Sequence, residues 1–227
     1  CDQKRNPSSE LIGYYGSHDT SNKVMTQINW SRFIKDSVWT EIVREKIKQQ
    51  ECFLRELGKE KESRLLSGYV RAVQWKDETN REGHAAKVYF NTLFGMDFSR
   101  SQDNNINAAL NYGYSILLSA FNREIVANGY ITQLGLFHDN MFNQFNFASD
   151  LMEPFRVLID RLVYDMNLID FEHEEKMKLV NVLNGAVCME GKHFVVNNAI
   201  KRYTKSVFDA INDSDISLLR FYSVNEL

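Results

Sequence analysis

The sequence predicts a mainly α-helical protein with one short β-hairpin. Only two prolines and eleven glycines interrupt 227 residues, so helix breakers are few. Apolar residues recur at three- and four-residue spacing through most of the chain, which is the period of a helix with one buried face. A hydrophobic share of 44% is ample for one sizeable core. We expect residues 1–26 to be a polar connector between domains and residues 27–227 to form one helical domain.

The apolar period predicts the helices in chain order. The polar run Ser99–Asn105 is expected to be a loop, and Asn128-Gly129 to end the long helix that follows it. We expect the next helix to begin near Ser149 or Asp150, with Asp150 as its N-cap and Pro154 within its first turn. The predicted helical segments are Val38–Ile47, Leu65–Val73, Glu82–Gly95, Ile106–Ile125, Asp150–Val163 and Glu172–Asn184.

The C-terminal part departs from this helical pattern once. Val187–Met189 and Phe194–Val196 are short apolar runs on either side of Glu190-Gly191-Lys192-His193, which predicts a β-hairpin. Asn198 is then expected to cap a last helix, and the tail from Asp213 to be loosely held.

Composition excludes several classes of protein. The net charge of −3 argues against a nucleic-acid binder of basic bulk composition, so DNA binding would need local patches, a bound metal or a partner. Three distant cysteines without a C-x-x-C pair suggest reduced thiols in a cytoplasm. No apolar run approaches about 18 residues, and no signal peptide is visible, so we expect no membrane association. Walker loops, dinucleotide fingerprints, nucleophile elbows and zinc ribbons are also absent from the sequence.

The candidate site residues are Glu82, His138, Asp150 and Glu153. They lie in three motifs: Arg81-Glu-Gly-His-Ala-Ala86, Leu134-Gly-Leu-Phe-His138 and Ser149-Asp-Leu-Met-Glu-Pro154. One imidazole with two or three carboxylates suits a hard or borderline divalent cation. Such a cation assists phosphodiester chemistry, because it polarises oxygen atoms and offsets negative charge.

Each of these residues also has a purely structural interpretation. Asp150 and Glu153 match the acidic form of a capping box. Glu82 at a helix start is favoured by the helix dipole, and His138 follows an apolar run in which a histidine is often a hydrogen-bonded core residue. The basic C-terminal residues are either a phosphate-contacting patch or a solvated helix face. These residues are Lys192, His193, Lys201, Arg202 and Lys205.

The order of the motifs along the chain is more specific than any one of them. Arg81–Gly95 (REGHAAKVYFNTLFG) is followed by Asp103–Leu117 (DNNINAALNYGYSIL), Gly135–His138 (GLFH) and Phe147–Arg156 (FASDLMEPFR). This succession closely resembles the CRISPR adaptation integrase, the universal catalytic subunit that inserts new spacers. The Asn91–Gly95 ending resembles its type II branch most.

The resemblance implies a site and a set of partners. It places the metal ligands on Glu82, His138 and Glu153, with Asp150 as a supporting acidic residue. Two or three carboxylates with one imidazole favour Mg²⁺ or Mn²⁺ over Zn²⁺. The family also implies an N-terminal β domain upstream of Cys1, a homodimer, a small ferredoxin-like partner protein and a place in prokaryotic antiviral defence.

The implied reaction is attack of a spacer DNA 3′-hydroxyl on a phosphodiester at the boundary of the CRISPR repeat. Lys87 and Arg156 are expected to help recognise phosphate. Two alternatives stay open: a hydrolytic nuclease for branched DNA that uses the same residues with water, and a helical scaffold without catalysis. In the enzyme, Glu153→Ala is expected to abolish activity at little cost in stability, whereas loss of a cap would cost roughly 0.5–2 kcal/mol.

Overall fold

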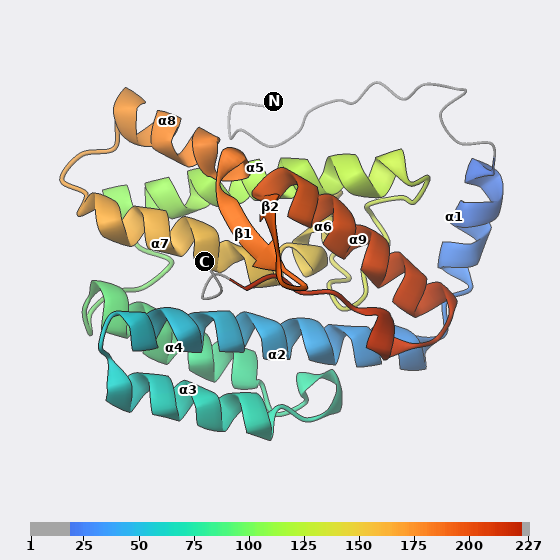
Figure 1. The fold of residues 1–227 in the computed structure, drawn as a ribbon, viewed down its shortest axis with the longest axis horizontal. Coiled ribbons are helices and arrows are strands. Elements are labelled where there is room, and N and C mark those ends of the chain that lie inside the picture. The colour runs from blue at the N-terminus through green and yellow to red at the C-terminus, as the bar shows by residue number, and fades with distance from the viewer. Residues whose placement is uncertain (1–18, 224–227) are drawn as a thin grey trace. The chain divides into compact units, whose positions relative to one another are not determined.

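The structure is a computed structural model that describes residues 19–223. Figure 1 shows a mainly α-helical chain with one antiparallel two-stranded sheet, which confirms the predicted fold class. The helices are α1 (Thr20–Ile28), α2 (Arg32–Glu56), α3 (Glu60–Ala72), α4 (Arg81–Phe94), α5 (Asn105–Ala127), α6 (Asn146–Leu151), α7 (Arg156–Met166), α8 (His173–Val180) and α9 (Val196–Asn212). The strands are β1 (Ala186–Met189) and β2 (Lys192–Val195).

The described chain divides into two compact units, and the division falls inside helices α2 and α5. The first unit contains the described residues up to Trp39, then Ser115–Met152 and the residues from Asn184 onward. The second unit contains Thr40–Tyr114 and Glu153–Leu183. The predicted boundary at residue 26 concerns a different part of the chain, and this division does not test it.

In the first unit, helix α9 packs against both strands of the hairpin (Figure 1). The strands pair in register from Ala186 opposite Val195 to Met189 opposite Lys192. Glu190 and Gly191 form the two-residue turn with positive φ angles of 54° and 70°, the backbone that a tight hairpin turn requires. The hairpin prediction is confirmed.

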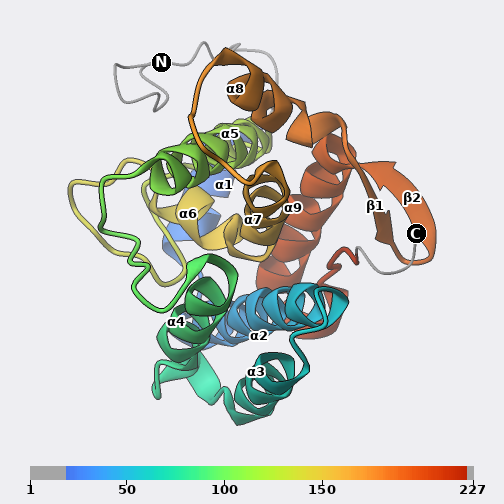
Figure 2. The same cartoon turned by 90° about the vertical axis from the view of Figure 1, so that its left-hand side faces the viewer.

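In the second unit, the C-terminal part of α2 lies in the same core as α4 and α7. Phe53 of α2 contacts the ring of Tyr89 in α4, with centroids 6.4 Å apart, and meets Tyr164 of α7 edge-on at 5.8 Å. Helix α3 packs beside α4 (Figure 2). These contacts bury Phe53 and Tyr89, and they fix α4, whose first turn carries Glu82.

Two predicted helix starts are wrong. Asp150 is not an N-cap, because it lies inside the short helix α6; a 3-10 turn at Glu153–Phe155 follows, and α7 begins only at Arg156. Pro154 explains the break, since its ring would clash with the carbonyl four residues back and it has no N–H to donate. Helix α9 begins at Val196, with Val195 as its N-cap residue, so Asn198 lies within the first turn.

The predicted connector is described only from residue 19 onward. Thr20–Ile28 form helix α1, which includes the end of the predicted polar connector, and residues 1–18 of that connector lie outside the described chain. None of the helices between residues 19 and 223 combines the length and apolar character that a membrane span requires.

Candidate functional site

Glu82 lies in the first turn of α4, as predicted, but its side chain does not cap that helix. The N-cap residue Asn80 adopts a left-handed backbone with φ 51°, and its side-chain oxygen accepts the Gly83 N–H at 3.2 Å. The carboxylate of Asp77 accepts the N–H groups of Arg81 and Glu82 at 2.8 and 3.0 Å. Because other residues satisfy these backbone donors, the Glu82 carboxylate is left for another partner.

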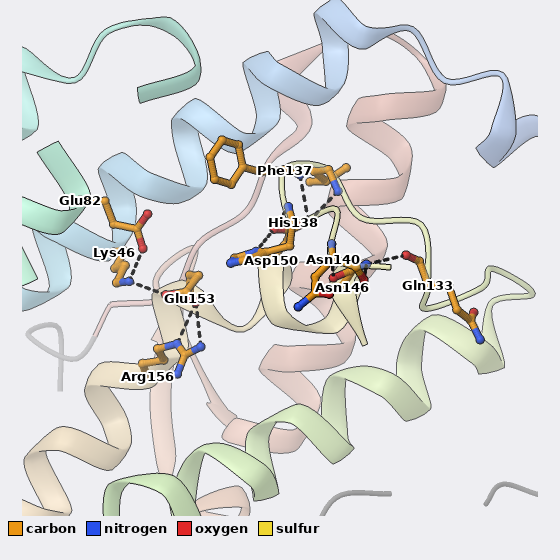
Figure 3. Close-up of polar contacts among 11 residues, drawn as sticks. Lys46, Glu82, Gln133, Phe137, His138, Asn140, Asn146, Asp150, Glu153 and Arg156 are labelled. Carbon is orange, nitrogen blue, oxygen red and sulfur yellow. Dashed lines mark hydrogen bonds and ion pairs between the residues drawn. The ribbon is translucent and has the colours of Figure 1, made fainter. Parts of the chain in front are cut away.

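That partner is Lys46, which also binds Glu153. The Lys46 ammonium donates to Glu82 Oε1 and to Glu153 Oε2 at 2.5 Å each (Figure 3). Glu153 Oε1 accepts Arg156 Nε at 2.9 Å, and Arg156 Nη2 lies 2.9 Å from the same oxygen. Since both carboxylate oxygens lie 2.5 Å from one nitrogen, they are at most twice that distance apart. In the second unit, two carboxylates thus bind the same ammonium group.

The charges in this cluster compensate one another. Burial opposes ionisation of Glu153, but the charges of Arg156 and Lys46 outweigh it and lower the pKa of the carboxyl to about 2. Burial also opposes the charge on Lys46, yet Glu153 and Glu82 raise the pKa of its ammonium. Glu153 is 3% exposed and is therefore a buried carboxylate that stays ionised.

His138 and Asp150 form a second pair, within the first unit. Asp150 Oδ2 accepts the N–H groups of Leu136 and Phe137 at 2.6 and 3.1 Å, and Oδ1 accepts that of His138 at 3.1 Å. The same Oδ1 lies 2.5 Å from His138 Nδ1 (Figure 3). Burial raises the pKa of the Asp150 carboxyl, against the lowering effect of these donors. In the neutral ring, a carboxylate that accepts Nδ1–H leaves the lone pair on Nε2.

The loop before α6 is shaped to bring Asp150 and His138 together. A Cβ atom on Gly135 would lie 2.5 Å from the carbonyl oxygen of His138 and 2.7 Å from Asp150 Oδ2, so only glycine fits there. Asn146 donates to the carbonyls of Gln133 and Asn140 (Figure 3). The motif Leu134–His138 therefore requires glycine at position 135, because the buried carboxylate of Asp150 approaches closely there.

Lys46 is the site residue that the sequence analysis missed. It lies four residues after Ile42 and three after Val43, on the stripe that buries those side chains in α2. A lysine on an apolar stripe needs a carboxylate partner when it is buried, and this signal was available in the sequence. Arg156, expected to recognise phosphate, donates to Glu153 instead.

The structure thus describes the four predicted site residues as two pairs. Glu82 and Glu153 belong to the second unit, and His138 and Asp150 belong to the first. Within residues 19–223, no group of three or more His, Cys, Asp or Glu side chains forms a ready metal-binding set. The donors of each pair nevertheless fit a hard or borderline divalent cation, because carboxylate oxygens suit a hard cation and an imidazole held by a carboxylate suits a borderline one.

Comparison with known proteins identifies the family. The profile described as "CRISPR associated protein Cas1" matches residues 12–176. The chain belongs to the Cas1 family. A CRISPR-associated endonuclease Cas1 from Neisseria meningitidis serogroup C (strain 8013) is 33% identical over 225 residues, which cover 97% of this chain and 74% of that protein. The resemblance read from the motif order is thereby confirmed.

Further Cas1 relatives are more distant. The CRISPR-associated endonuclease Cas1 1 of Francisella tularensis subsp. novicida (strain U112) is 28% identical over 164 residues, covering 62% of this chain and 52% of its own length. Among solved structures, a casposase bound to integration product matches with a TM-score of 0.75 at 17% identity, over 94% of this chain and 74% of that one. The last likeness concerns the fold. Membership of the Cas1 family supports the coarse prediction of a nuclease or integrase of CRISPR adaptation.

Proposed function

We propose that this Cas1-family protein is a metal-dependent DNA integrase. It would join the 3′-hydroxyl of a spacer DNA to a phosphodiester at the boundary of the CRISPR repeat. In this transesterification the 3′ oxygen forms a new bond to phosphorus, the repeat strand's own P–O3′ bond breaks, and that strand leaves with a 3′-hydroxyl. The nucleophile belongs to the DNA, so no protein side chain needs to attack.

The observation that carries the proposal is that Glu82 and Glu153 both bind the ammonium of Lys46. Two carboxylates fixed around a single ammonium form a pair of oxygen donors that is already oriented for a cation. Both are supported, since Glu153 also binds Arg156 and Glu82 sits on a helix turn capped by other residues. Glu153 is 3% exposed, and a buried acidic residue with no role beyond packing would be costly to keep ionised.

The resemblance to the family implies His138 as a further ligand, and within its own unit Asp150 holds the ring through Nδ1 and leaves Nε2 for a cation. Bound Mg²⁺ or Mn²⁺ would polarise the phosphoryl oxygen and offset charge on the leaving 3′ oxygen. The protein's own part is to hold these donors still. Three backbone N–H groups fix Asp150, and Lys46 and Arg156 fix Glu153.

The partners proposed are DNA, a second copy of the chain and a small ferredoxin-like adaptation protein. Relatives named CRISPR-associated endonuclease support action on phosphodiesters. A Cas6-RT-Cas1--Cas2 complex, which matches with a TM-score of 0.75 at 17% identity over 96% of this chain and 28% of that one, supports a Cas2-type partner.

The first test is strand joining on a branched, half-integrated DNA with Mn²⁺. Glu153→Gln keeps the shape of the side chain and one acceptor oxygen, for Lys46 or for Arg156, and it removes the charge that a cation needs. We expect joining to fall by at least about 100-fold. Glu174→Gln, an exposed residue of α8, is the matched control and should join DNA like the wild type.

The products separate the open alternatives. Cleaved ends without joined strands would indicate the hydrolytic nuclease, and equal activity of the wild type and Glu153→Gln would contradict the proposed site. A scaffold would show neither product. The reaction on a branched substrate isolates the site from the need for a partner protein.

A second readout uses binding alone. In Lys46→Met no ammonium competes for Glu82 and Glu153, so Mn²⁺ should raise the melting temperature of this variant more than that of the wild type. At 100 times its Kd, the cation adds about 2.7 kcal/mol to the free energy of unfolding. Lys48→Met, an exposed position of the same helix, should respond like the wild type. Equal responses in all three proteins would contradict cation binding by these two carboxylates.

A further inference from the structure

A small cavity in the second unit adjoins Glu153 and contains a cation that the proposed reaction does not use. The cavity has a volume of about 150 Å³ and is lined by Arg100, Lys46, Gln50, Glu153 and Arg156, among others. This volume exceeds the roughly 30 Å³ that one water occupies in the liquid by enough to admit a phosphate group. Arg100 comes from the polar loop before α5.

Neutral groups hold Arg100 in place. Its guanidinium donates to the side-chain oxygen of Asn107 and, at 2.6 Å, to that of Asn111, both in α5. It also lies over the rings of Phe90 and Tyr114, at 5.7 and 5.4 Å from their centroids. Amides and ring faces orient a guanidinium, but they do not neutralise it.

Arg100 differs in this respect from the other two cations of the cavity. Lys46 is paired with Glu82 and Glu153, and Arg156 is paired with Glu153. Within residues 19–223, no carboxylate comes within 4 Å of the Arg100 guanidinium to form an ion pair. Burial lowers the pKa of this side chain, and Tyr114 and Asp160, which also line the cavity, only partly oppose the shift. A half-buried charge without a counter-ion is unfavourable until an anion supplies one.

The cavity wall also includes an unsatisfied polar group. Gln50 is 2% exposed, and its Oε1 has no hydrogen-bond partner in the described part of the chain. A dry apolar ligand would leave both this oxygen and the Arg100 charge uncompensated. A hydrated anion would serve both, because its charge pairs with Arg100 and a bridging water donates to Gln50.

We infer that this cavity binds a backbone phosphate of the DNA strand, with Arg100 as its cationic ligand. The inference rests on the proposed function, because it is the DNA substrate that supplies the phosphate. The planar guanidinium offers two parallel donors to the phosphate oxygens, a geometry that an ammonium lacks. Arg100 would therefore position the strand beside Glu153 without taking part in the bond exchange.

The test is methylphosphonate interference, measured as the Kd of the full chain for branched DNA without divalent metal. Each backbone phosphate near the branch is replaced in turn by a neutral methylphosphonate. We expect one replacement to weaken wild-type binding by about ten- to hundredfold. Arg100→Gln should bind unmodified DNA more weakly by a similar factor and be insensitive to that same replacement. Its salt dependence, log K against log salt, should be shallower by about one.

Two control variants separate charge from position. Arg64→Gln, an exposed arginine of α3, should keep the wild-type interference profile. Arg100→Lys keeps the charge but loses the two parallel donors of the guanidinium. Its affinity should therefore depend on salt as in the wild type, whereas a methylphosphonate at the sensitive position should weaken its binding less. If Arg100→Gln does not fold, Arg100→Lys and the wild-type profile still decide the question.

A wild-type profile with no sensitive phosphate would overturn the inference, as would an identical profile in Arg100→Gln. Stabilisation of the wild type by inorganic phosphate together with a flat DNA profile would mean that the cavity holds free phosphate, which also overturns it. Strand joining with Mn²⁺ is measured separately. If the wild type joins strands but Arg100→Gln has the same interference profile as the wild type, only the phosphate subsite is contradicted. If one phosphate is sensitive in the wild type but no strands are joined, only the proposed integrase reaction is contradicted.

Discussion

Asp150 and Glu153 are buried carboxylates three residues apart, and their surroundings stabilise them in opposite ways. Asp150 is surrounded by backbone N–H groups and one imidazole, and burial raises its pKa. Glu153 is surrounded by full positive charges from Arg156 and Lys46, and its pKa falls to about 2. Backbone N–H groups and charged side chains both favour the ionised form, but burial outweighs the donors at Asp150, whereas the full charges outweigh burial at Glu153. The comparison assigns Asp150 to holding His138 and Glu153 to holding cations.

The largest effect expected from this difference is on stability. Asp150→Ala leaves one buried and two part-buried N–H groups without their acceptor, and a buried group left in this way costs about 1–3 kcal/mol, so we expect the free energy of unfolding to fall by roughly 4 kcal/mol. Glu153→Gln keeps the volume of the side chain and one of its two acceptor oxygens, so it should lose less. Urea unfolding of the two variants measures the difference. Equal losses of unfolding free energy would mean that the two carboxylates stabilise the fold to the same extent, which would contradict the difference described above.

The same reasoning revises what was expected of Glu153→Ala. Little stability cost was predicted for it, but the alanine variant would leave Arg156 without its ion-pair partner and Lys46 with Glu82 alone. Breaking a buried ion pair by removing one partner costs about 3–5 kcal/mol. Loss of activity in Glu153→Ala would therefore mix chemistry with unfolding, and this is why glutamine is the informative replacement.

Local features of the site were predictable from the sequence. The start of α4 beside Glu82 follows from apolar periodicity, and the hairpin follows from Glu190-Gly191 between two apolar runs. The role of Asp150 was not predictable in this way. A capping box uses partners within three residues, but the actual donors of Asp150 lie 12 to 14 residues earlier in the chain. Only the tertiary fold brings them together.

Lys46 and Arg100 show a second limit of the sequence. Each is a charged residue whose meaning depends on a neighbour far along the chain: Lys46 binds Glu153 from 107 positions away. The position of Lys46 on an apolar stripe signals burial, but periodicity does not say which carboxylate it meets. Arg100 lies in a polar run that reads as an ordinary loop, so its orientation toward a cavity has no signature in the sequence.

Asp160 provides a third buried carboxylate that sharpens the comparison. It is 1% exposed and accepts the Tyr114 hydroxyl at 2.5 Å; burial raises its pKa to about 6, although Tyr114 and Arg156 partly oppose the shift. Because the folded pKa lies above the unfolded value, the native state binds an extra proton between about pH 4 and 6. The stabilisation is complete below this window and is lost as the pH rises through about 6.

Asp160→Asn cannot titrate and should therefore lack this dependence. From pH 4 to pH 7 we expect the wild type to lose about 2.4 kcal/mol of unfolding free energy relative to Asp160→Asn, since one pKa unit corresponds to about 1.36 kcal/mol. Urea unfolding of both proteins at several pH values gives this double difference. Parallel pH profiles would show that Asp160 titrates normally in the folded protein.

The smallest effect concerns the space around Asp150. Gly135→Ala would place a methyl group against the His138 carbonyl and Asp150 Oδ2, so we expect a loss of about 2 kcal/mol. Gly68→Ala in α3 meets nothing within 4 Å and should instead gain up to about 1 kcal/mol from helix propensity. The imidazole ¹⁵N shifts of His138 report the bond to Asp150, and they should change in Gly135→Ala alone. If stability falls but the His138 shifts stay unchanged, the loop backbone has moved to make room for the methyl group and the Asp150–His138 hydrogen bond has persisted. That hydrogen bond would then resist perturbation as well as the ion pairs of Glu153 do.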